Sequence, residues 1–345
     1  MTDEPLPAPA EPNPALVEVT RGPLVESLHR GAAVVCAATG EQVAAWGDVG
    51  RRVFPRSAVK PLQALPLIET GAADRFGLSD SELALACASH SGQPLHVQLI
   101  DAWLDQLGLS DADLECGAHP PLDAAAARAL AAEGRLPSAL HNNCSGKHTG
   151  MLTTALHMGE PIRGYIAADH PVQRRIAAVL GEMAGAPSEP GIFAVDGCGI
   201  PTFALPLSGL AAAMARLAAP AAFGPVRQAA AHRIRSAMAA HPGLVAGDGR
   251  LCTEVMEAVP TILLKGGAEG VYAAMLPTRG LGVAVKIDDG AKRAAEVAVM
   301  AVLRHLGAFS PGQERTLRHR FTPPVLNVAG KVVGELRPAA NTFKA

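Results

Sequence analysis

The chain has 345 residues, of which 49% are hydrophobic and 18% are charged. This composition provides enough apolar surface for a folded core and excludes a disordered chain. The formal net charge of -2 lacks the basic excess of nucleic-acid-binding proteins, so we expect no nucleic-acid partner. Aromatic residues, which usually line large apolar binding sites, number only two Trp, two Tyr and eight Phe. We therefore expect a small polar ligand.

The first residues differ in composition from the rest of the chain. Residues 1–15 contain five prolines and no apolar run after a basic start, so we predict a disordered tail and not a signal peptide. No stretch of the chain reaches the roughly 20 apolar residues of a membrane span. We expect a cytoplasmic protein without membrane contact, whose cysteines are reduced thiols. Residues 16–340 are expected to form a single domain.

The next segments change from β to helical periodicity. Residues 16–47 alternate short β-rich runs with glycine turns, and the sequence ATGE at 38–41 is a hairpin signal. From residue 57 to about residue 186 the pattern is helical, and Ser79 with Glu82 forms a predicted capping box. The helices of this block are predicted over 57–71, 79–87, from Pro94 onward, and over 124–133, 146–158 and 171–183.

The second half of the chain returns to strands. Residues 192–199 (IFAVDGCG) read as a buried strand that ends in a glycine-flanked turn. Helices are predicted over 210–217, 226–239, 253–258 and 291–306, and strands over 261–267, 270–276, 280–287 and in a hairpin over 325–336. Strands at both ends with helices between them predict an α/β fold. Its antiparallel sheet, from residues 16–50 and 260–340, is flanked by helices and closes over a helical block at about 57–186.

The lysines point to candidate catalytic residues. Only seven of the 30 basic residues are lysine, so arginine supplies most of the surface charge. Lysine can lose its proton and act as a base, which arginine cannot do. Ser57 and Lys60 form an SxxK pair at a predicted helix start, where residues three apart share a face and the amine can take the hydroxyl proton. The alternative is a helix-capping serine beside a solvated lysine.

Two further segments carry residues of the same types. Ser89 lies in ASHSG at the end of a predicted helix, where it can serve either as a C-cap residue or in a site. Lys265 is followed by two glycines at the end of a predicted strand. Glycine lets the backbone approach a ligand closely, so Lys265 is a candidate to hold a carboxylate or to assist a second serine.

The densest polar cluster is HNNCSGKH at 141–148, and it includes Cys144, Lys147 and His148. VDGCG adds Asp196 and Cys198 at a predicted strand end, which is a usual position for site residues in α/β folds. Two separated sulfurs with nitrogen and oxygen donors suit zinc, although their spacing is not that of a known structural zinc site. Buried neutral thiols are the alternative.

Together, the motifs RSAVKP, ASHSG, HNNCSGKH, VDGCGIP and KGGAEGV give the chain a specific likeness. With these motifs in this order, the chain resembles the rhizobial-type, zinc-containing L-asparaginases of the asparaginase II family, from about residue 16 to residue 338. The resemblance implies a fold similar to serine β-lactamases and glutaminases, and a homodimer. The β-lactamase motif KTG reads KGG here, so the threonine hydroxyl of that group is absent.

The resemblance also implies roles for individual residues. It implies two Ser/Lys tandems, Ser57 with Lys60 and Ser89 with Lys265. It implies zinc held by two cysteines and a lysine, which are Cys144, Cys198 and Lys147 here. The candidates that hold the α-carboxylate and α-amine of the substrate are Arg56, His148 and Asp196.

The expected function is hydrolysis of L-asparagine to L-aspartate and ammonia. Lys60 is expected to take the proton of Ser57, which attacks the amide carbon, while Ser89 and Lys265 relay the proton or position the amide. Which serine is acylated stays open at this point. One alternative is a related serine amidohydrolase of the glutaminase or β-lactamase type. The other is a non-catalytic sensor that binds zinc or an amino acid.

Overall fold

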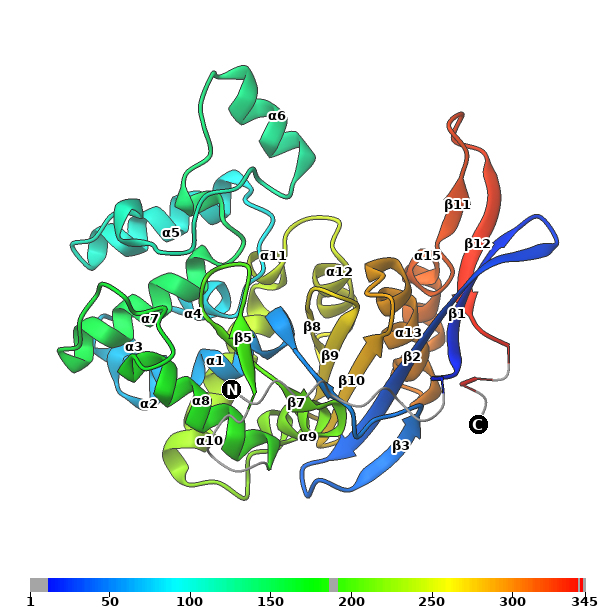
Figure 1. The fold of residues 1–345 in the computed structure, drawn as a ribbon, viewed down its shortest axis with the longest axis horizontal. Coiled ribbons are helices and arrows are strands. Elements are labelled where there is room, and N and C mark those ends of the chain that lie inside the picture. Colours follow the sequence, from blue (N-terminus) through cyan, green and yellow to red (C-terminus); the bar gives the residue numbers. More distant parts are fainter. Residues whose placement is uncertain (1–11, 186–191, 341, 344–345) are drawn as a thin grey trace.

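An antiparallel sheet joins the two ends of the chain in the computed structural model, which describes residues 12–185, 192–340 and 342–343 (Figure 1). Its eight strands among these residues are β1 (Ala15–Arg21), β2 (Leu24–Ala37), β3 (Gln42–Trp46), β8 (Leu263–Gly266), β9 (Val271–Leu276), β10 (Leu281–Ile287), β11 (Pro324–Leu326) and β12 (Val332–Pro338). Their order is β11-β12-β1-β2-β10-β9-β8, and β3 also pairs with β2. Because β2 pairs with β10, the predicted assembly of one sheet from distant parts of the chain is confirmed.

The helical block lies between two short strands, β4 (Arg52–Val53) and β5 (Phe193–Val195). Its elements are η1 (Arg56–Val59), α1 (Lys60–Gln63), α2 (Leu65–Glu69), α3 (Ala72–Arg75), α4 (Asp80–Ala86), α5 (Pro94–Gln106), η2 (Asp111–Asp113), α6 (Ala124–Ala132), η3 (Ala139–His141), α7 (Ser145–Met158) and α8 (Pro171–Ala184). The capping box predicted at the start of α4 is confirmed, because Ser79 N donates to Glu82 Oε2 at 2.8 Å and Ser79 Oγ accepts from the α4 backbone.

Both faces of the sheet are covered near its centre. The remaining elements are β6 (Pro201–Phe203), β7 (Leu205–Pro206), α9 (Leu207–Ala218), α10 (Pro225–Ala240), α11 (Pro242–Val245), α12 (Leu251–Ala258), α13 (Lys292–His305), α14 (Pro311–Thr316) and α15 (Arg318–Phe321). Every residue of β9 is buried, which requires cover on both faces because successive side chains alternate. Helices α9 and α13 both pack on β9 and β10. A side chain at Gly282 would lie 2.1 Å from Ala211 O, so glycine is what allows α9 to approach β10 this closely.

Two predicted elements are wrong in detail. The helix predicted over 57–71 is divided into η1, α1 and α2, because Pro61 and Pro66 lack the N–H that a continuous helix needs. The strand predicted as buried over 192–199 is exposed at β5. It pairs with β6 in a local hairpin, because its turn closes within a few residues through Asp196 N to Ile200 O, and it does not reach the main sheet.

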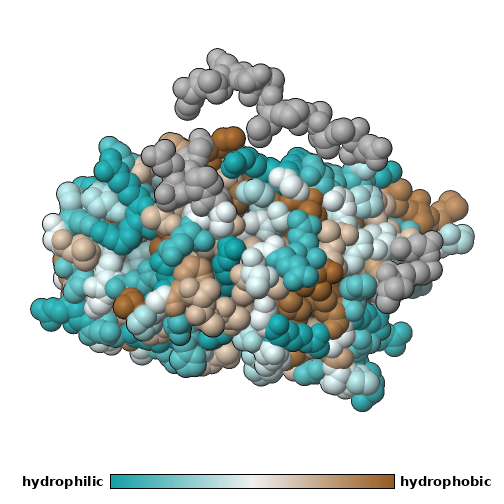
Figure 2. All heavy atoms as spheres, turned by 90° about the horizontal axis from the view of Figure 1, so that it is seen from below, coloured by the Kyte–Doolittle hydropathy of each residue, from teal (hydrophilic) through white to brown (hydrophobic). Residues whose placement is uncertain are grey.

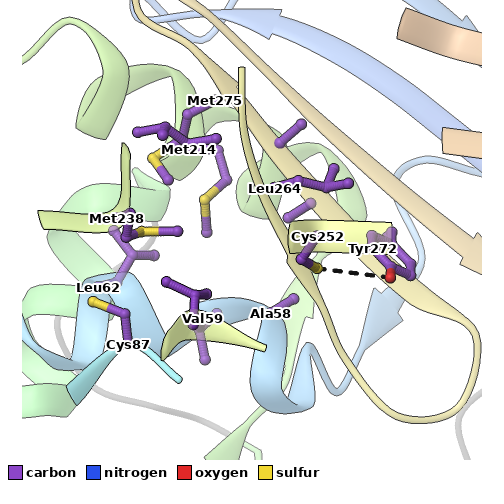
Figure 3. Close-up of a cluster of buried hydrophobic side chains, with 14 of the residues drawn as sticks. Ala58, Val59, Leu62, Cys87, Met214, Met238, Cys252, Leu264, Tyr272 and Met275 are labelled. Carbon is purple, nitrogen blue, oxygen red and sulfur yellow. Dashed lines mark hydrogen bonds between the residues drawn. The ribbon is translucent and has the colours of Figure 1, made fainter. Parts of the chain in front are cut away.

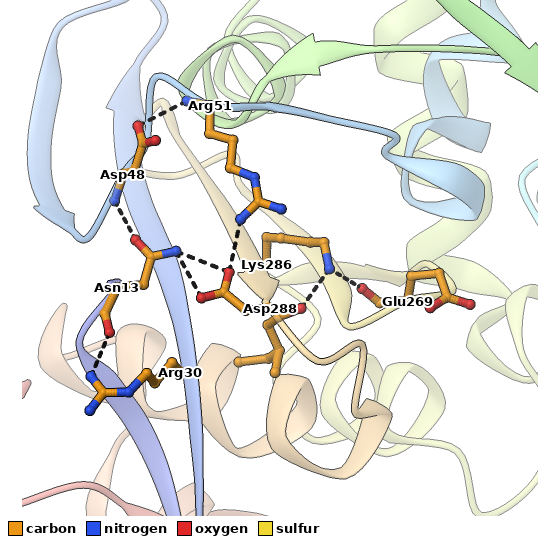
Figure 4. A network of polar contacts seen from close by, with 8 residues as sticks. Asn13, Arg30, Asp48, Arg51, Glu269, Lys286 and Asp288 are labelled. Carbon is orange, nitrogen blue, oxygen red and sulfur yellow. Dashed lines mark hydrogen bonds and ion pairs between the residues drawn. The ribbon is translucent and has the colours of Figure 1, made fainter. Parts of the chain in front are cut away.

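The predicted tail, residues 1–15, falls largely outside the described residues, which begin at residue 12. Within the described part, Ala15 begins β1 and Asn13 is only 4% exposed. Figure 4 shows that the Asn13 side chain accepts a hydrogen bond from Asp48 N and donates to both carboxylate oxygens of Asp288. Residues 13–15 therefore make ordered contacts with the rest of the described structure.

An apolar cluster supports the start of the helical block. Figure 3 shows side chains of η1 and α1, including Val59 and Leu62, packed with Cys87 at the end of α4 and with side chains of α9, α10 and β8. All of these residues are buried. The cluster fixes η1 against both the sheet and the helical block. As for the membrane, the described part of the chain contains no helix with the length and apolar character of a transmembrane span.

Candidate active site

The sequence-predicted site residues come from five separate parts of the fold. Ser57 lies in η1 at the start of α1, Ser89 in the loop after α4, and Lys265 on β8. Cys144, Lys147 and His148 lie at the start of α7, and Asp196 and Cys198 lie in the turn between β5 and β6. Strand β8 is the edge of the main sheet, and η1 packs directly against it. A side chain at Gly267 would lie 2.7 Å from Pro55 O, so the glycine after β8 allows this approach. The site lies where the sheet edge meets the helical block.

The backbone before Ser57 is strained. Arg56 has a positive φ of 51°, which is uncommon for residues other than glycine. The arginine side chain is fixed in this position by an ion pair from Nε to Asp196 Oδ1 at 2.6 Å. Such strain persists where surrounding contacts impose it, and it often marks functional sites. Ser57 itself is half-buried and lines open cavities.

Ser89 lies between two buried lysines. Lys60 Nζ donates to Ser89 Oγ at 2.9 Å, and Lys265 Nζ lies 2.8 Å from the same oxygen. Lys60 is further held by Ala88 O at 2.6 Å and Asn143 O at 3.2 Å. The predicted partner of Lys60 was Ser57, but no hydrogen bond joins these two among the described residues. The Lys60 side chain points instead into the interior, where carbonyl and hydroxyl oxygens satisfy its amine.

Burial shifts the proton affinity of both lysines. Desolvation lowers the pKa of Lys60, and it lowers the pKa of Lys265 to about 7. The nearby charges of Lys60 and Arg250 also lower the pKa of Lys265, whereas Cys252 and Cys144 raise it. Near neutral pH the amine of Lys265 can therefore be uncharged and can accept the proton of Ser89. The two lysines and the serine form a chain along which a proton can move.

A second cluster combines two thiols with an amine. Lys147 Nζ lies 3.0 Å from Cys198 Sγ, which lies 4.0 Å from Asp196 Oδ2. A hydrogen bond from Cys198 lowers the pKa of Cys144, favouring its thiolate. Burial alone would lower the pKa of Lys147, but the neighbouring thiols outweigh it and the net effect is a raised pKa. The structure thus brings together the three predicted zinc ligands.

The donor set at this cluster can be compared with what zinc requires. Within the described part of the chain, no group of three or more His, Cys, Asp or Glu side chains could hold a metal ion. A zinc site here therefore needs Lys147 as its third protein ligand, after loss of its proton. The two soft sulfur donors, with one of them poised as a thiolate, fit zinc chemically.

Of the three predicted substrate-binding residues, the structure brings two to the cavities. Arg56 and Asp196 face the thiol cluster, but His148 is fully buried and lines neither cavity described below. Its Nδ1 lies 2.7 Å from Tyr165 OH, and Nε2 has no partner among the described residues. Consecutive residues on α7 point about 100° apart, so His148 turns away from the side on which Lys147 meets Cys198.

Two adjoining cavities open beside Ser57. The Ser89 cavity, of about 410 Å³, is lined by residues that include Ser57, Ser89, Asn143, Arg250, Ala268 and Tyr272. The Cys198 cavity, of about 210 Å³, is lined by residues that include Arg56, Ser57, Asn143, Asp196, Cys198 and Ala268. Ser57, Asn143 and Ala268 belong to both walls. A small molecule seated at Ser57 therefore reaches both cavities.

Comparisons with known proteins show the family of the chain. The family model of L-asparaginase II matches residues 17–338. The chain belongs to the L-asparaginase II family. A search of curated proteins found no match. Among solved structures, a β-lactamase from Mycobacterium bovis is similar at 15% identity and a TM-score of 0.40, over 79% of this chain and 94% of that one.

Membership of the L-asparaginase II family makes the protein an amidohydrolase that acts on a linear amide of a small molecule. The antiparallel sheet with flanking helices agrees with the predicted fold class. Residues of the candidate site that the sequence did not reveal include Asn143, Tyr272 and Arg250. Asn143 lies inside the polar cluster at 141–148, which is a usable signal. Arg250 and Tyr272 lie in ordinary sequence surroundings and become recognisable only in the folded chain.

The shifted pKa of Lys265 predicts how the amidase rate depends on pH. Below about pH 7 Lys265 is protonated and cannot act as a base, so kcat/KM should fall about tenfold per pH unit there and level off above. Ammonia release between pH 5.5 and 9 measures this limb. Lys265→Met should remove it, whereas Lys331→Met, at an exposed loop position, should retain it. A wild-type rate that is constant from pH 5.5 to 8 would contradict the assignment.

Proposed function

We propose that this protein hydrolyses L-asparagine to L-aspartate and ammonia, with Ser57 as the nucleophile. The observation that carries the proposal is the placement of Ser89 Oγ between two buried lysine amines in a cavity whose wall includes Ser57. This arrangement supplies a base for a serine hydroxyl without histidine. Family membership and the small, polar cavities support a small amide as the substrate.

The reaction proceeds in two stages. When the substrate binds, the uncharged Lys60 amine turns from Ser89 Oγ toward Ser57 and accepts its proton, while Ser57 Oγ forms a bond to the side-chain amide carbon. The carbon–nitrogen bond breaks, and ammonia leaves with the proton that Lys60 returns. Water then attacks the ester, which gives aspartate and restores the Ser57 hydroxyl. Ser89 and Lys265 pass protons to and from Lys60 during both stages.

Replacing the two serines separately tests the choice of nucleophile. Ser57→Ala removes the attacking oxygen, so kcat should fall by about 10³-fold or more, with no acyl-enzyme detectable by mass spectrometry. Ser89→Ala should also slow ammonia release but should still form the acyl-enzyme. Ser236→Ala on α10 is the control and should keep the wild-type rate. If Ser57→Ala keeps most of the amidase rate, Ser57 is not the nucleophile.

We further propose that Cys144, Lys147 and Cys198 hold a zinc ion. Support comes from the 3.0 Å approach of Lys147 Nζ to Cys198 Sγ and from the lowered pKa of Cys144. When bound, zinc supplies positive charge that can orient a polar substrate, although two thiolates weaken it as a Lewis acid. Arg56 and Asp196 lie beside it in the Cys198 cavity and can position the substrate's polar groups.

Metal content of purified variants tests the zinc proposal. The wild-type protein should carry about one zinc per chain by elemental mass spectrometry, because two thiolates and an amine provide three ligands. Cys144→Ser and Cys198→Ser should each lose that zinc while keeping their far-ultraviolet circular dichroism. Cys36→Ser, which replaces a thiol on β2, should retain the metal. Equal zinc in the wild type and in Cys144→Ser would show that the ion is held elsewhere.

The rival activities are separated by substrate. A related serine amidohydrolase of the glutaminase or β-lactamase type would share Ser57 and Lys60 but cleave another amide. Comparison of ammonia release from asparagine and glutamine with nitrocefin turnover distinguishes them. Gly266 follows Lys265 at the position where the β-lactamase motif has threonine, which favours a linear amide. Family membership favours catalysis over the alternative of a zinc or amino-acid sensor.

We also propose that the protein forms a homodimer through two projecting hairpins. In Figure 1 the β1–β2 and β11–β12 hairpins extend beyond the body of the molecule, and Figure 2 shows hydrophobic surface at that end. Leu24 is 72% exposed, Val332 68%, and Val328 fully exposed. Contiguous apolar surface of this kind often marks protein interfaces.

We place the protein in the cytoplasm, a reducing compartment that suits the six cysteines, which are all free thiols.

The mass in solution tests the dimer. Val328→Asp places a charge in the proposed interface, so it should shift the light-scattering mass from twice the chain mass toward the monomer. Leu136→Asp is a matched control, because Leu136 is 87% exposed but lies in the loop after α6. A monomeric wild-type protein at micromolar concentration, or a dimer unaffected by Val328→Asp, would disprove the proposed interface.

A further inference from the structure

One cation of the Ser89 cavity has no carboxylate partner. Arg250 precedes α12 and is half-buried in the cavity wall. Its Nη1 donates to Ser91 Oγ at 3.2 Å, and Ser91 Oγ donates to Ala246 O at 2.8 Å. No ion pair joins Arg250 to an acidic residue of the described ranges. The guanidinium is thus anchored by one neutral hydrogen bond and keeps donors for a ligand.

The other cations around Ser57 are already compensated. Arg56 is paired with Asp196 at 2.6 Å. Lys147 Nζ already lies 3.0 Å from Cys198 Sγ. An anionic ligand would have to compete with these partners, so neither cation is free to receive it.

The amines nearer to Arg250 are also engaged. Lys60 and Lys265 donate to the same serine and to backbone carbonyls deep in the site. Lys292, at the mouth of the cavity, is 61% exposed and lies 3.6 Å from Glu296. Arg250 is therefore the one cation in the described lining of the Ser89 cavity that combines partial burial with an uncompensated charge.

The two cavities differ in charge. The described lining of the Ser89 cavity contains cations and no carboxylate, whereas the Cys198 cavity contains Asp196. Ser57 and Asn143 lie in both walls, at the junction between the cavities. A substrate that carries both a carboxylate and an ammonium group on one carbon can direct the carboxylate to Arg250 and the ammonium group toward Asp196, which also pairs with Arg56.

We propose that Arg250 binds the α-carboxylate of the substrate in the Ser89 cavity, with the α-ammonium directed toward Asp196. The inference rests on the proposed asparaginase function and assigns the group that recognises an amino-acid carboxylate. A guanidinium can form two parallel hydrogen bonds to a carboxylate, which fixes orientation as well as charge. The same charge lies close enough to Lys265 to contribute to its lowered pKa.

Asparagine analogues that lack one group test this subsite. 3-Aminopropanamide lacks the α-carboxylate, and succinamate lacks the α-amine. Arg250→Gln should reduce kcat/KM for asparagine and succinamate about 30-fold or more, mainly through KM, because a paired charge is lost. It should leave kcat/KM for 3-aminopropanamide within about twofold of the wild type. Arg250→Lys should recover part of the loss, and Arg318→Gln on α15 should match the wild type.

Three outcomes separate this proposal from the proposed function. An equal loss for all three amides in Arg250→Gln would overturn the subsite, because it would show that Arg250 acts through Lys265 or through the fold. Calorimetric binding of L-aspartate supplies a readout that needs no turnover. If the wild type binds aspartate, Arg250→Gln weakens that binding about 30-fold, and neither cleaves asparagine, the subsite is right and the asparaginase assignment is wrong. Unchanged aspartate binding in Arg250→Gln would overturn the subsite.

Discussion

The site depends on two lysine amines buried on either side of a single serine hydroxyl. Charged amines are costly to remove from water, so their burial favours the neutral form and turns lysine into a base near neutral pH. The structure limits this cost by giving Lys60 three oxygen partners and Lys265 two. Two full positive charges this close would repel each other, which makes sharing of a proton through Ser89 the favourable state. The chemistry therefore follows from where the chain places these two side chains.

That placement depends on packing that is remote from polar chemistry. The apolar cluster of η1, α1, α4, α9, α10 and β8 fixes the segment that carries Ser57 and Lys60. Glycine at 267 lets the β8 end lie against Pro55, and the Arg56–Asp196 pair holds the strained backbone from the other side. Interiors pack at nearly crystalline density, so a shift in any of these elements would move Ser57 relative to the two lysine amines. Ser57 is positioned by its surroundings more than by its own helix.

Local signals in the sequence predicted most of the elements and singled out several residues that the structure brings together at the candidate site. The capping box at Ser79 and the turns between strands depend on near neighbours, so they could be predicted. The pairing of Lys60 with Ser89 could not, because spacing along a helix indicates which residues share a face but not which distant loop meets that face. Phe193 and its neighbours look like a buried strand because hydrophobicity alone does not specify a pairing partner. Arg250 has no sequence signature, since its role depends on charges that approach only in the folded chain.

The order of strands in the sheet has a consequence for synthesis. The inner half of β2 lies between β3 and β10, and β10 belongs to the last quarter of the chain. While the ribosome is still making the helical block, Val34 and Val35 of β2 therefore lie on an open strand edge, the kind of surface that favours association between nascent chains. Lys265 emerges after both serines, so the proton chain can assemble only once most of the polypeptide has been made.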